Sequence, residues 1–186
     1  VGGLEFGHGS DLDLVFIHDG DPQAETDGAK PIDGAQFFTR LGQRIIHLLT
    51  TQTASGALYE VDMRLRPSGA AGLLVSSLGA FQRYQENEAW TWEHLALTRA
   101  RVVAVAGEGA ERLAEDIEAL RLAVLRRRGT DPRVMPDLAD MRERIFTAKP
   151  IDGRWEAKIG PGRLQDIDLL AQSLALRAGD PARGTL

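Results

Sequence analysis

The sequence predicts an α+β protein in which a mixed region of strands and helices is followed by a helical region. Apolar and β-branched runs that are too short for helices predict strands in the first part of the chain. Those runs are residues 12–17, 57–66 and 72–77. After them the pattern changes to one typical of helices. We therefore expect a first domain over residues 1–106 and a helical second domain over residues 107–186.

The composition is that of an ordinary globular protein, and it excludes several classes of protein. The 186 residues carry a net charge of −5 from 22 basic and 27 acidic residues, so we expect no general affinity for nucleic acid. The absence of cysteine excludes disulfides and thiolate metal sites and fits a cytoplasmic location. No apolar run approaches the roughly 18–20 residues that span a bilayer. Because the chain begins at Val1 and ends in the polar sequence GDPARGTL, we interpret it as a piece of a larger protein.

A strand, a loop and a helix are predicted in that order near the start of the chain. The run LDLVFI (12–17) favours a strand, and residues 19–31 are rich in Asp, Gly and Pro, which is typical of a loop. A helix is expected from residue 32 to about residue 51, with Asp33 as its N-cap. Its buried face is predicted from apolar residues at three- and four-residue spacing, which are Phe38, Leu41, Ile45 and Leu48.

The segment ALYEVDMRLR (57–66) has the cleanest alternation in the chain and predicts a strand with two distinct faces. Its apolar face consists of Tyr59, Val61, Met63 and Leu65. Its polar face consists of Glu60, Asp62, Arg64 and Arg66. Pro67 is expected to end this strand, because proline cannot donate a ladder hydrogen bond. A further strand is expected within GLLVSS (72–77).

Helices are expected over most of the remaining chain. The predicted segments are 77–88, 89–103, 108–128, 136–147 and 164–177. The third of them places basic residues at its end, as the helix macrodipole favours. Trp90 and Trp92 are two residues apart and cannot share one helix face. We therefore expect one of these two rings in the core and the other at a surface or cleft.

The first candidate site is the acid pair Asp11 and Asp13, which follows Gly9 and Ser10 in GSDLDLVF. On a strand, two residues separated by one point to the same face, roughly 6.5–7 Å apart. Such carboxylates suit one or two divalent cations, and Mg²⁺ completes its shell with phosphate oxygens and water. A glycine and a serine before the pair leave room for a phosphate near backbone N–H groups. The alternatives are a surface turn that leads into a strand and the acid pair of a glycosyltransferase.

Asp62 supplies a third acid on the polar face of the predicted strand 57–66. If that strand pairs beside the first, three carboxylates converge on one metal site. Arg64 and Arg66 follow on the same face, and their forked donors suit phosphate oxygens. Three acids and two arginines at these spacings favour phosphoryl or nucleotidyl transfer. The alternative is a half-exposed edge strand with an ordinary charged surface.

The other polar candidates favour structural roles. His8, His18, His47 and His94 have no ligand spacing relative to one another. We expect Glu93, Arg99 and Arg101 on a solvated or interdomain face. Lys158, Asp166 and Asp168 flank the GPGRL turn, where acids at a helix N-terminus are favoured by the macrodipole. An extension of the active site by these three residues is the alternative.

Four segments of the chain resemble the adenylyl-transferring half of glutamine synthetase adenylyltransferase, a bifunctional bacterial enzyme family. They are GGLEFGHGSDLDLVFIHD (2–19), SGALYEVDMRLRPSGAAGLLVSSLGAF (55–81), YQENEAWTWEHLALTRARVV (84–103) and, more loosely, KIGPGRLQDIDLLAQ (158–172). The middle two are the most specific, and the third resembles the transferase repeat more than the deadenylylating one. In the last segment the family pattern is closer to GPGGLxDIEF, so Arg163, Asp168 and Leu169 depart from it.

The resemblance implies a polymerase-β-like nucleotidyltransferase core followed by helices. It implies that Asp11, Asp13 and Asp62 are catalytic and hold Mg²⁺ or Mn²⁺. The glycine signature is Gly9 and Ser10, which directly precede Asp11, or alternatively Gly2 and Gly3. The implied reaction transfers AMP from ATP to a tyrosine of glutamine synthetase, under regulation by glutamine and the PII signalling protein. The phosphorolytic removal of AMP and a catalytically silent nucleotide-binding module remain alternatives.

Overall fold

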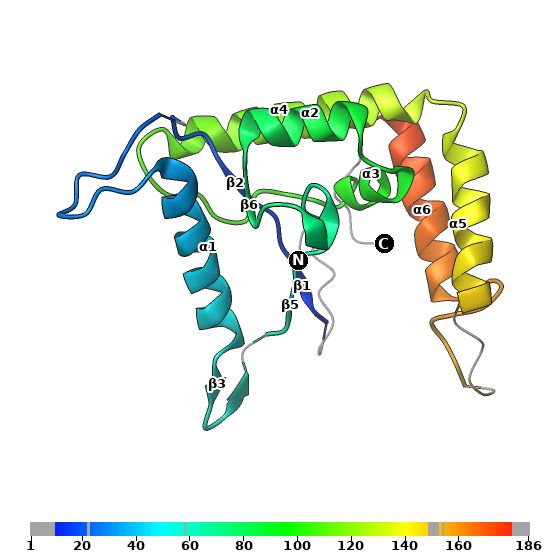
Figure 1. Ribbon diagram of the computed structural model, residues 1–186. Coiled ribbons are helices and arrows are strands. Elements are labelled where there is room, and N and C mark those ends of the chain that lie inside the picture. The colour runs from blue at the N-terminus through cyan, green and yellow to red at the C-terminus, as the bar shows by residue number, and fades with distance from the viewer. Residues whose placement is uncertain (1–9, 22, 58, 149–152, 154, 180–186) are drawn as a thin grey trace. The chain divides into compact units, whose positions relative to one another are not determined.

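A computed structural model describes residues 10–21, 23–57, 59–148, 153 and 155–179 (Figure 1). Strands and helices are mixed in the first half and helices alone follow, which confirms the predicted α+β class. The described residues divide into two compact units. The strand unit contains residues 10–89 and 107–113, and the helical unit contains residues 90–106 and 114–179. The expected domain boundary at residue 106 stays a prediction. In the described part of the chain, every helix is too short or too polar to cross a membrane.

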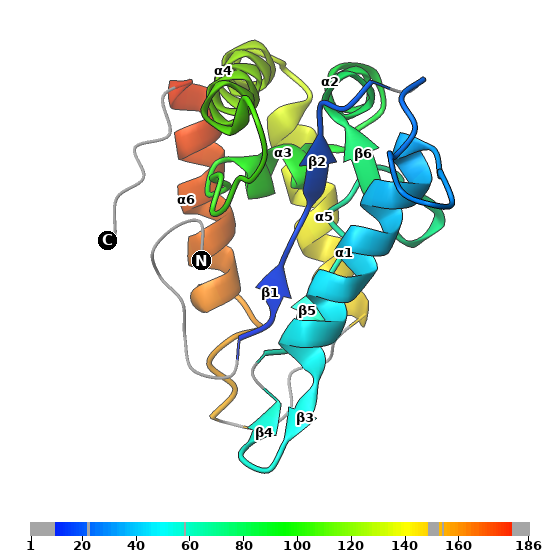
Figure 2. The same ribbon diagram turned by 90° about the vertical axis from the view of Figure 1, so that its left-hand side faces the viewer.

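The strands of the strand unit form three separate pairs (Figure 2). They are β1 (Leu12–Asp13) with β5 (Val61–Asp62), β2 (Phe16–His18) with β6 (Val75–Ser77), and β3 (Gln52–Thr53) with β4 (Gly56–Ala57). The first two pairs are parallel and the third is antiparallel. The predicted strand 12–17 is therefore divided, because its two ends pair with different strands. The third pair was not predicted.

The prediction of one continuous strand over 57–66 was wrong, because the chain turns after Asp62. The backbone N–H of Arg64 donates to Oδ1 of Asp62 at 2.8 Å, which closes a local turn instead of a ladder bond. A short 3₁₀ helix, Gly69–Ala71, follows before β6. Side-chain bonding by an aspartate to the backbone two residues on therefore replaced the predicted extended path.

Helices α1 (Gly34–Thr50) and α2 (Leu78–Asn87) complete the strand unit, and both contact β6. Asp33 caps α1 as predicted, accepting from the N–H of Gln36 at 2.8 Å. The predicted buried face of α1 was partly wrong. Leu41 and Leu48 are exposed. Gly42 is buried instead, and it packs so closely that a Cβ there would lie 2.9 Å from a methyl of Val75.

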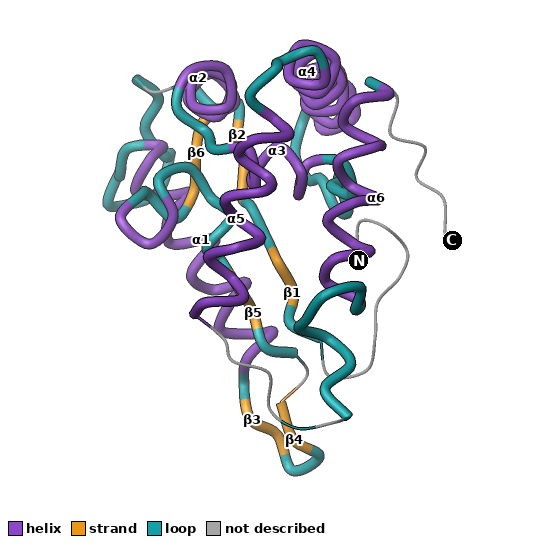
Figure 3. Tube along the Cα trace, turned by 90° about the vertical axis from the view of Figure 1, so that its right-hand side faces the viewer, coloured by secondary structure: helices purple, strands orange, loops and turns teal. Residues whose placement is uncertain are grey.

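The helical unit consists of α3 (Thr91–Leu97), most of α4 (Ala110–Gly129), α5 (Val134–Ala148) and α6 (Leu164–Ala178), drawn as purple tubes in Figure 3. The predicted helix 89–103 was too long, since α3 ends at Leu97. Its last carbonyls are occupied from outside the helix, because the guanidinium of Arg121 donates to the carbonyls of Leu97 and Thr98 at 3.0 and 3.5 Å. The predicted helices over 108–128, 136–147 and 164–177 match α4, α5 and α6 within two residues.

The core of the helical unit is a buried apolar cluster formed by Leu95, Leu125, Val134 and Leu176. Two sequence predictions around it were wrong. Glu93 is buried, because its carboxylate accepts from the N–H of Trp90 at 2.8 Å and caps α3. Trp90 and Trp92 are both exposed, so neither indole is a core residue. Arg163, which departs from the family pattern, has a φ of −90°, which is ordinary extended backbone.

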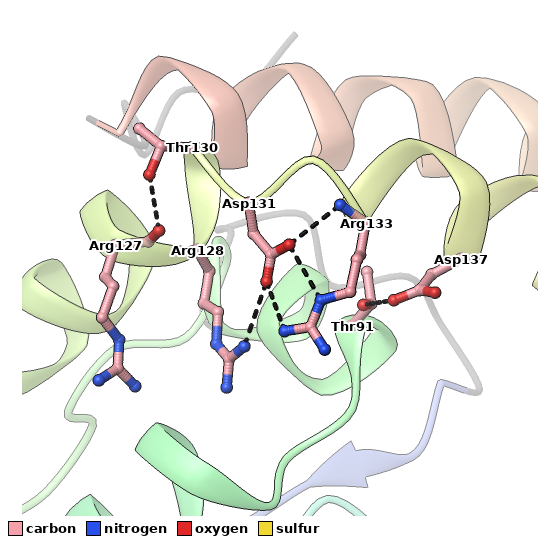
Figure 4. Close-up of polar contacts among 7 residues, drawn as sticks. All are labelled: Thr91, Arg127, Arg128, Thr130, Asp131, Arg133 and Asp137. Atoms are coloured by element: carbon pink, nitrogen blue, oxygen red, sulfur yellow. Dashed lines mark hydrogen bonds and ion pairs between the residues drawn. The ribbon is translucent and has the colours of Figure 1, made fainter.

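The connection from α4 to α5 is fixed by an aspartate between two arginines (Figure 4). Asp131 accepts from the guanidinium groups of Arg128 and Arg133 at 3.4 and 2.8 Å, and from the backbone N–H of Arg133 at 3.0 Å. These bonds hold the pKa of the Asp131 carboxyl far below its usual range, with the side chain of Arg133 as the largest cause. At the start of α5, Asp137 accepts from the hydroxyl of Thr91. Salt bridges thus fix the path of the chain into α5.

Candidate active site

The parallel pairing of β1 with β5 brings two of the predicted acids side by side. The register places Asp13 opposite Asp62 and Leu12 opposite Val61. The pairing is fixed by backbone bonds from Leu12 N to Glu60 O at 2.8 Å and from Leu14 N to Asp62 O at 3.0 Å. In-register residues of neighbouring parallel strands lie about 4.8 Å apart and project from the same face of the sheet. The two aspartates therefore share one face, as the sequence analysis required of neighbouring strands.

The raised pKa of Asp13 indicates that negative charges lie close together on this face. Its pKa is raised above the model-compound value of 3.8, first by partial burial and then by the charges of Asp62 and Asp11. Arg64 opposes this shift in part. Asp11 itself is exposed and lies just before β1. The charges of Asp11 and Asp62 thus both act on Asp13.

Asp62 is engaged by Arg64 through both carboxylate oxygens. The guanidinium donates two bonds to Oδ2, one of them from Nε at 2.7 Å, and the backbone N–H donates to Oδ1. These bonds hold the pKa of Asp62 below its usual value. The side chain of Asp62 is only 13% exposed, whereas that of Arg64 is 79% exposed. The arginine is therefore the partner that can move without disturbing packing.

Arg66 lies apart from this pair, because the strand on which it was predicted ends at Asp62. Its guanidinium donates to the carbonyls of Met63, Ala70 and Gly72 at 2.8, 3.2 and 3.4 Å. The turn that it braces is tight, since a Cβ on Gly72 would lie 1.8 Å from the carbonyl oxygen of Pro67. In the structure Arg66 shapes the loop after the acids, and its assignment to a phosphate stays a prediction.

Two predicted site residues remain, Gly9 and Ser10. Ser10 is exposed and directly precedes Asp11, whereas Gly9 lies outside the described residues. Within the ranges that the structure describes, no three acids or histidines surround a single point as metal ligands would. Asp62 explains this in part, because both of its oxygens face Arg64. The structure thus pairs Asp13 with Asp62 and leaves the third carboxylate nearby.

Two further groups clarify what belongs to the site. His18, on β2, stacks on Phe38 with ring centroids 4.2 Å apart, and burial lowers its pKa, so it acts as an aromatic packing residue.

In the helical unit, Asp166 binds Arg142 at 2.6 Å and Asp168 binds Arg99 at 2.9 Å. Both aspartates lie near the N-terminus of α6, where the sequence analysis expected acids, and each also bonds to an arginine from another segment of the helical unit. The bonding of Arg64 to Asp62 was not foreseen, although a two-residue Asp–Arg spacing at a strand end is the signal that indicates it.

Comparison with known proteins identifies relatives of this chain. Residues 1–116 match the family model of glutamate-ammonia ligase adenylyltransferase. The chain is 68% identical over 190 aligned positions to the bifunctional glutamine synthetase adenylyltransferase/adenylyl-removing enzyme of Pseudomonas putida, an alignment that covers 95% of this chain. The proteins of the same description from Pseudomonas aeruginosa and Pseudomonas syringae are 70% identical over 78% of the chain and 58% identical over 95% of it. The chain spans only 14–19% of the length of these relatives.

Proposed function

The chain belongs to the glutamate-ammonia ligase adenylyltransferase family, and from this premise we propose that it supplies the chemistry of AMP transfer from ATP to a tyrosine of glutamine synthetase. The tyrosine oxygen attacks the α-phosphorus, the bond from that phosphorus to the bridging oxygen breaks, and pyrophosphate leaves. The observation that carries the proposal is the register of β1 and β5, which places Asp13 beside Asp62. Carboxylates in register on two strands are a costly arrangement for a surface without a function.

The donor set fits a divalent cation, and we propose Mg²⁺ or Mn²⁺ held by Asp11, Asp13 and Asp62. All of the candidate donors are carboxylate oxygens, which both ions accept, and Mg²⁺ needs only one or two of them beside phosphate oxygens. The raised pKa of Asp13 supports this fit, because partial burial is its largest cause and the charges of Asp62 and Asp11 add a repulsion that a cation would relieve. When bound, the cation would neutralise charge on the triphosphate and on the leaving pyrophosphate.

Arg64 is proposed to change partners when nucleotide binds. In the structure it occupies both oxygens of Asp62, so it must leave before that carboxylate acts as a ligand or as a base. A triphosphate offers the guanidinium a forked acceptor of higher charge. Once Arg64 has moved, the oxygens of Asp62 are free to hold the cation and to accept the tyrosine proton. Ser10 and Gly9 are proposed to approach a phosphate through their backbone N–H groups.

The reverse reaction is the second candidate function. The printed description of the relatives joins the adenylyltransferase to an adenylyl-removing enzyme, and both chemistries need the same acids. The resemblance of residues 84–103 to the transferase repeat favours transfer. We propose glutamine synthetase as the protein substrate, glutamine and the PII protein as regulators, and the cytoplasm as the location, all of them on the basis of the family.

An exchange assay tests the proposal and separates the two directions. The 186-residue chain is incubated with unmodified glutamine synthetase and ATP labelled at the α-phosphate, with and without a chelator. Label on the synthetase only when the divalent cation is free supports transfer. A parallel reaction starts from labelled adenylylated synthetase with inorganic phosphate. Loss of label in this second reaction alone would replace transfer by removal, and no change in either reaction would favour the silent nucleotide-binding module.

A further inference from the structure

Helix α6 carries an apolar face that no other described element of the helical unit covers. Leu164, Ile167, Leu170 and Leu174 are 62%, 51%, 54% and 57% exposed. Their spacing of three and four residues aligns them along one side of the helix. Single exposed aliphatic residues are normal on a protein surface, but four in a row along a helix form a continuous stripe. We call these four residues the α6 stripe.

The opposite side of α6 is already fixed inside the helical unit. Leu176 belongs to the buried apolar cluster, and Leu169 packs against that cluster. A Cβ on Gly129, at the end of α4, would lie 2.2 Å from the carbonyl oxygen of Leu176, so the two backbones are in close contact. This contact prevents a rotation of α6 that would turn the stripe inward. The stripe is therefore an outer face of the folded unit.

The inner face of α6 is less apolar than its outer face, which is the reverse of a surface helix. Gln172 and Ser173 are buried, although four large aliphatic residues on the same helix are exposed. A continuous apolar face of a helix is normally covered by another element. Its polar flanks need no partner, because Asp166 and Asp168 are already paired with arginines of this unit. A partner that covers the α6 stripe must therefore contact it through apolar side chains.

We infer that the α6 stripe is the docking face for an amphipathic helix from the same polypeptide, in the part that its relatives carry beyond this segment. The relatives are about five times longer than the matched segment, so chain is available to cover it. From Leu164 to Leu174 the stripe extends about 15 Å, which is nearly three turns. An incoming helix of that length needs apolar residues at the same three- and four-residue spacing. This inference is independent of the proposed transfer reaction.

A tethered helix fits the size and charge of the stripe better than other occupants do. Four half-exposed aliphatic side chains offer about 400 Å² at most, whereas a specific stable dimer buries about 800 Å² on each partner. A covalent connection removes this requirement, because it supplies a high effective concentration. The charged residues on α6 are Asp166, Asp168 and Arg177, whereas helices that lie on membranes are rich in lysine and arginine.

The absence of cysteine from the chain allows a direct test by thiol labelling. Leu170→Cys, in the stripe, is compared with Ala139→Cys, an exposed position on α5, and Leu174→Cys serves as a second stripe variant. Each substitution is made in the 186-residue chain and in a chimera in which the chain replaces its matched segment of the Pseudomonas putida relative. Alkylation by iodoacetamide at each thiol is followed by mass spectrometry of the corresponding peptide.

The inference predicts that both stripe thiols react in the 186-residue chain at a rate similar to that of the Ala139→Cys thiol. In the chimera they react at least tenfold more slowly, while the Ala139→Cys thiol keeps its rate. Equal rates for stripe and control thiols within the chimera would overturn the inference. A stripe thiol that is already slow in the isolated chain and becomes faster on dilution would also overturn it, because a second copy would then be the occupant.

Discussion

The strand unit and the helical unit hold their polar groups in opposite ways. In the strand unit, the candidate site sits on strands of two residues, and the charges of Asp62 and Asp11 repel that of Asp13. In the helical unit, Arg121 is 4% exposed, and its guanidinium bonds to Glu118 and to the carbonyls that end α3. The first arrangement costs stability and the second contributes to it.

This difference indicates where function and stability reside. Charges that repel one another are kept only where a ligand compensates for them, and their neutralisation is not expected to unfold the chain. A buried, fully bonded arginine is different, because its removal leaves buried acceptors without donors. Substitutions in the strand unit are thus expected to change activity, and substitutions at Arg121 to change stability.

The largest expected effect is on transfer by Asp13→Asn. The variant should lose roughly 10²–10³-fold in AMP transfer, since it removes one charge from the face that would hold the cation. The matched control is Asp19→Asn, an exposed acid just beyond β2. Initial rates of label transfer to glutamine synthetase measure both. Near-normal turnover of Asp13→Asn at saturating Mg²⁺ would remove this residue from the site.

The next effect is on stability, through Arg121→Met. We expect the free energy of unfolding to fall by about 3 kcal/mol, because the carbonyls of Leu97 and Thr98 and the carboxylate of Glu118 lose their donor. Arg126→Met, at an exposed position on the same helix, should change it by less than about 0.5 kcal/mol. Urea denaturation followed by circular dichroism gives both values. An equal fall in the free energy of unfolding in both variants would contradict the proposed role of Arg121 in the stability of the helical unit.

A smaller effect is expected for Arg64→Ala on the apparent KM for ATP. A rise of about tenfold with a smaller change in turnover is expected, because the guanidinium contributes binding both before and during transfer. Arg64→Lys should recover only part of the loss, since an ammonium group lacks the bidentate fork. Steady-state kinetics in ATP distinguish the variants. An unchanged KM for Arg64→Ala would show that the phosphates bind elsewhere.

The smallest effect concerns the pH dependence of stability. The folded pKa of Asp13 is raised above 3.8, so ionisation of this carboxyl destabilises the folded state as pH rises through that pKa. Asp13→Asn should therefore raise the Tm of the apo chain at pH 7, on the order of 2 °C. The gain should vanish below the unfolded pKa, where the wild-type carboxyl is protonated in both states. Thermal melts of the wild type and of Asp13→Asn at pH 7 and pH 3.5 measure this difference. A lower Tm for the variant at pH 7 would show that the charge of Asp13 does not destabilise the folded state.

Much of this arrangement could be predicted from residue patterns. Helix positions followed from apolar spacing, and the cap at Asp33 followed from its residue type. Parallel pairing of Asp13 with Asp62 was anticipated as a condition for the site, and the register satisfies it. The helices and the cap depend on nearby residues, and the register depends on one pair of strands. Short residue patterns can indicate features of both kinds.

Contacts between distant residues could not be predicted. The end of α3 depends on Arg121, which lies 24 residues beyond Leu97, and no local signal marks that bond. The exposure of Trp90 and Trp92 depends on how α3 packs, so helical spacing alone predicted it wrongly. The turn after Asp62 arose because side-chain bonding competed with the strand ladder, and alternation cannot show such competition.

The central claim is that Asp13 and Asp62 form the cation-dependent nucleotide site of this chain. Thermal melting with ATP tests it most directly, because it requires no protein substrate. Mg²⁺ with ATP should raise the Tm of the wild type and of Asp19→Asn, since a ligand at a hundredfold excess over Kd stabilises by about 2.7 kcal/mol. ATP with a chelator should not do so, and Asp13→Asn should show little shift in either condition. Equal shifts with and without the chelator, or a full shift in Asp13→Asn, would contradict the claim.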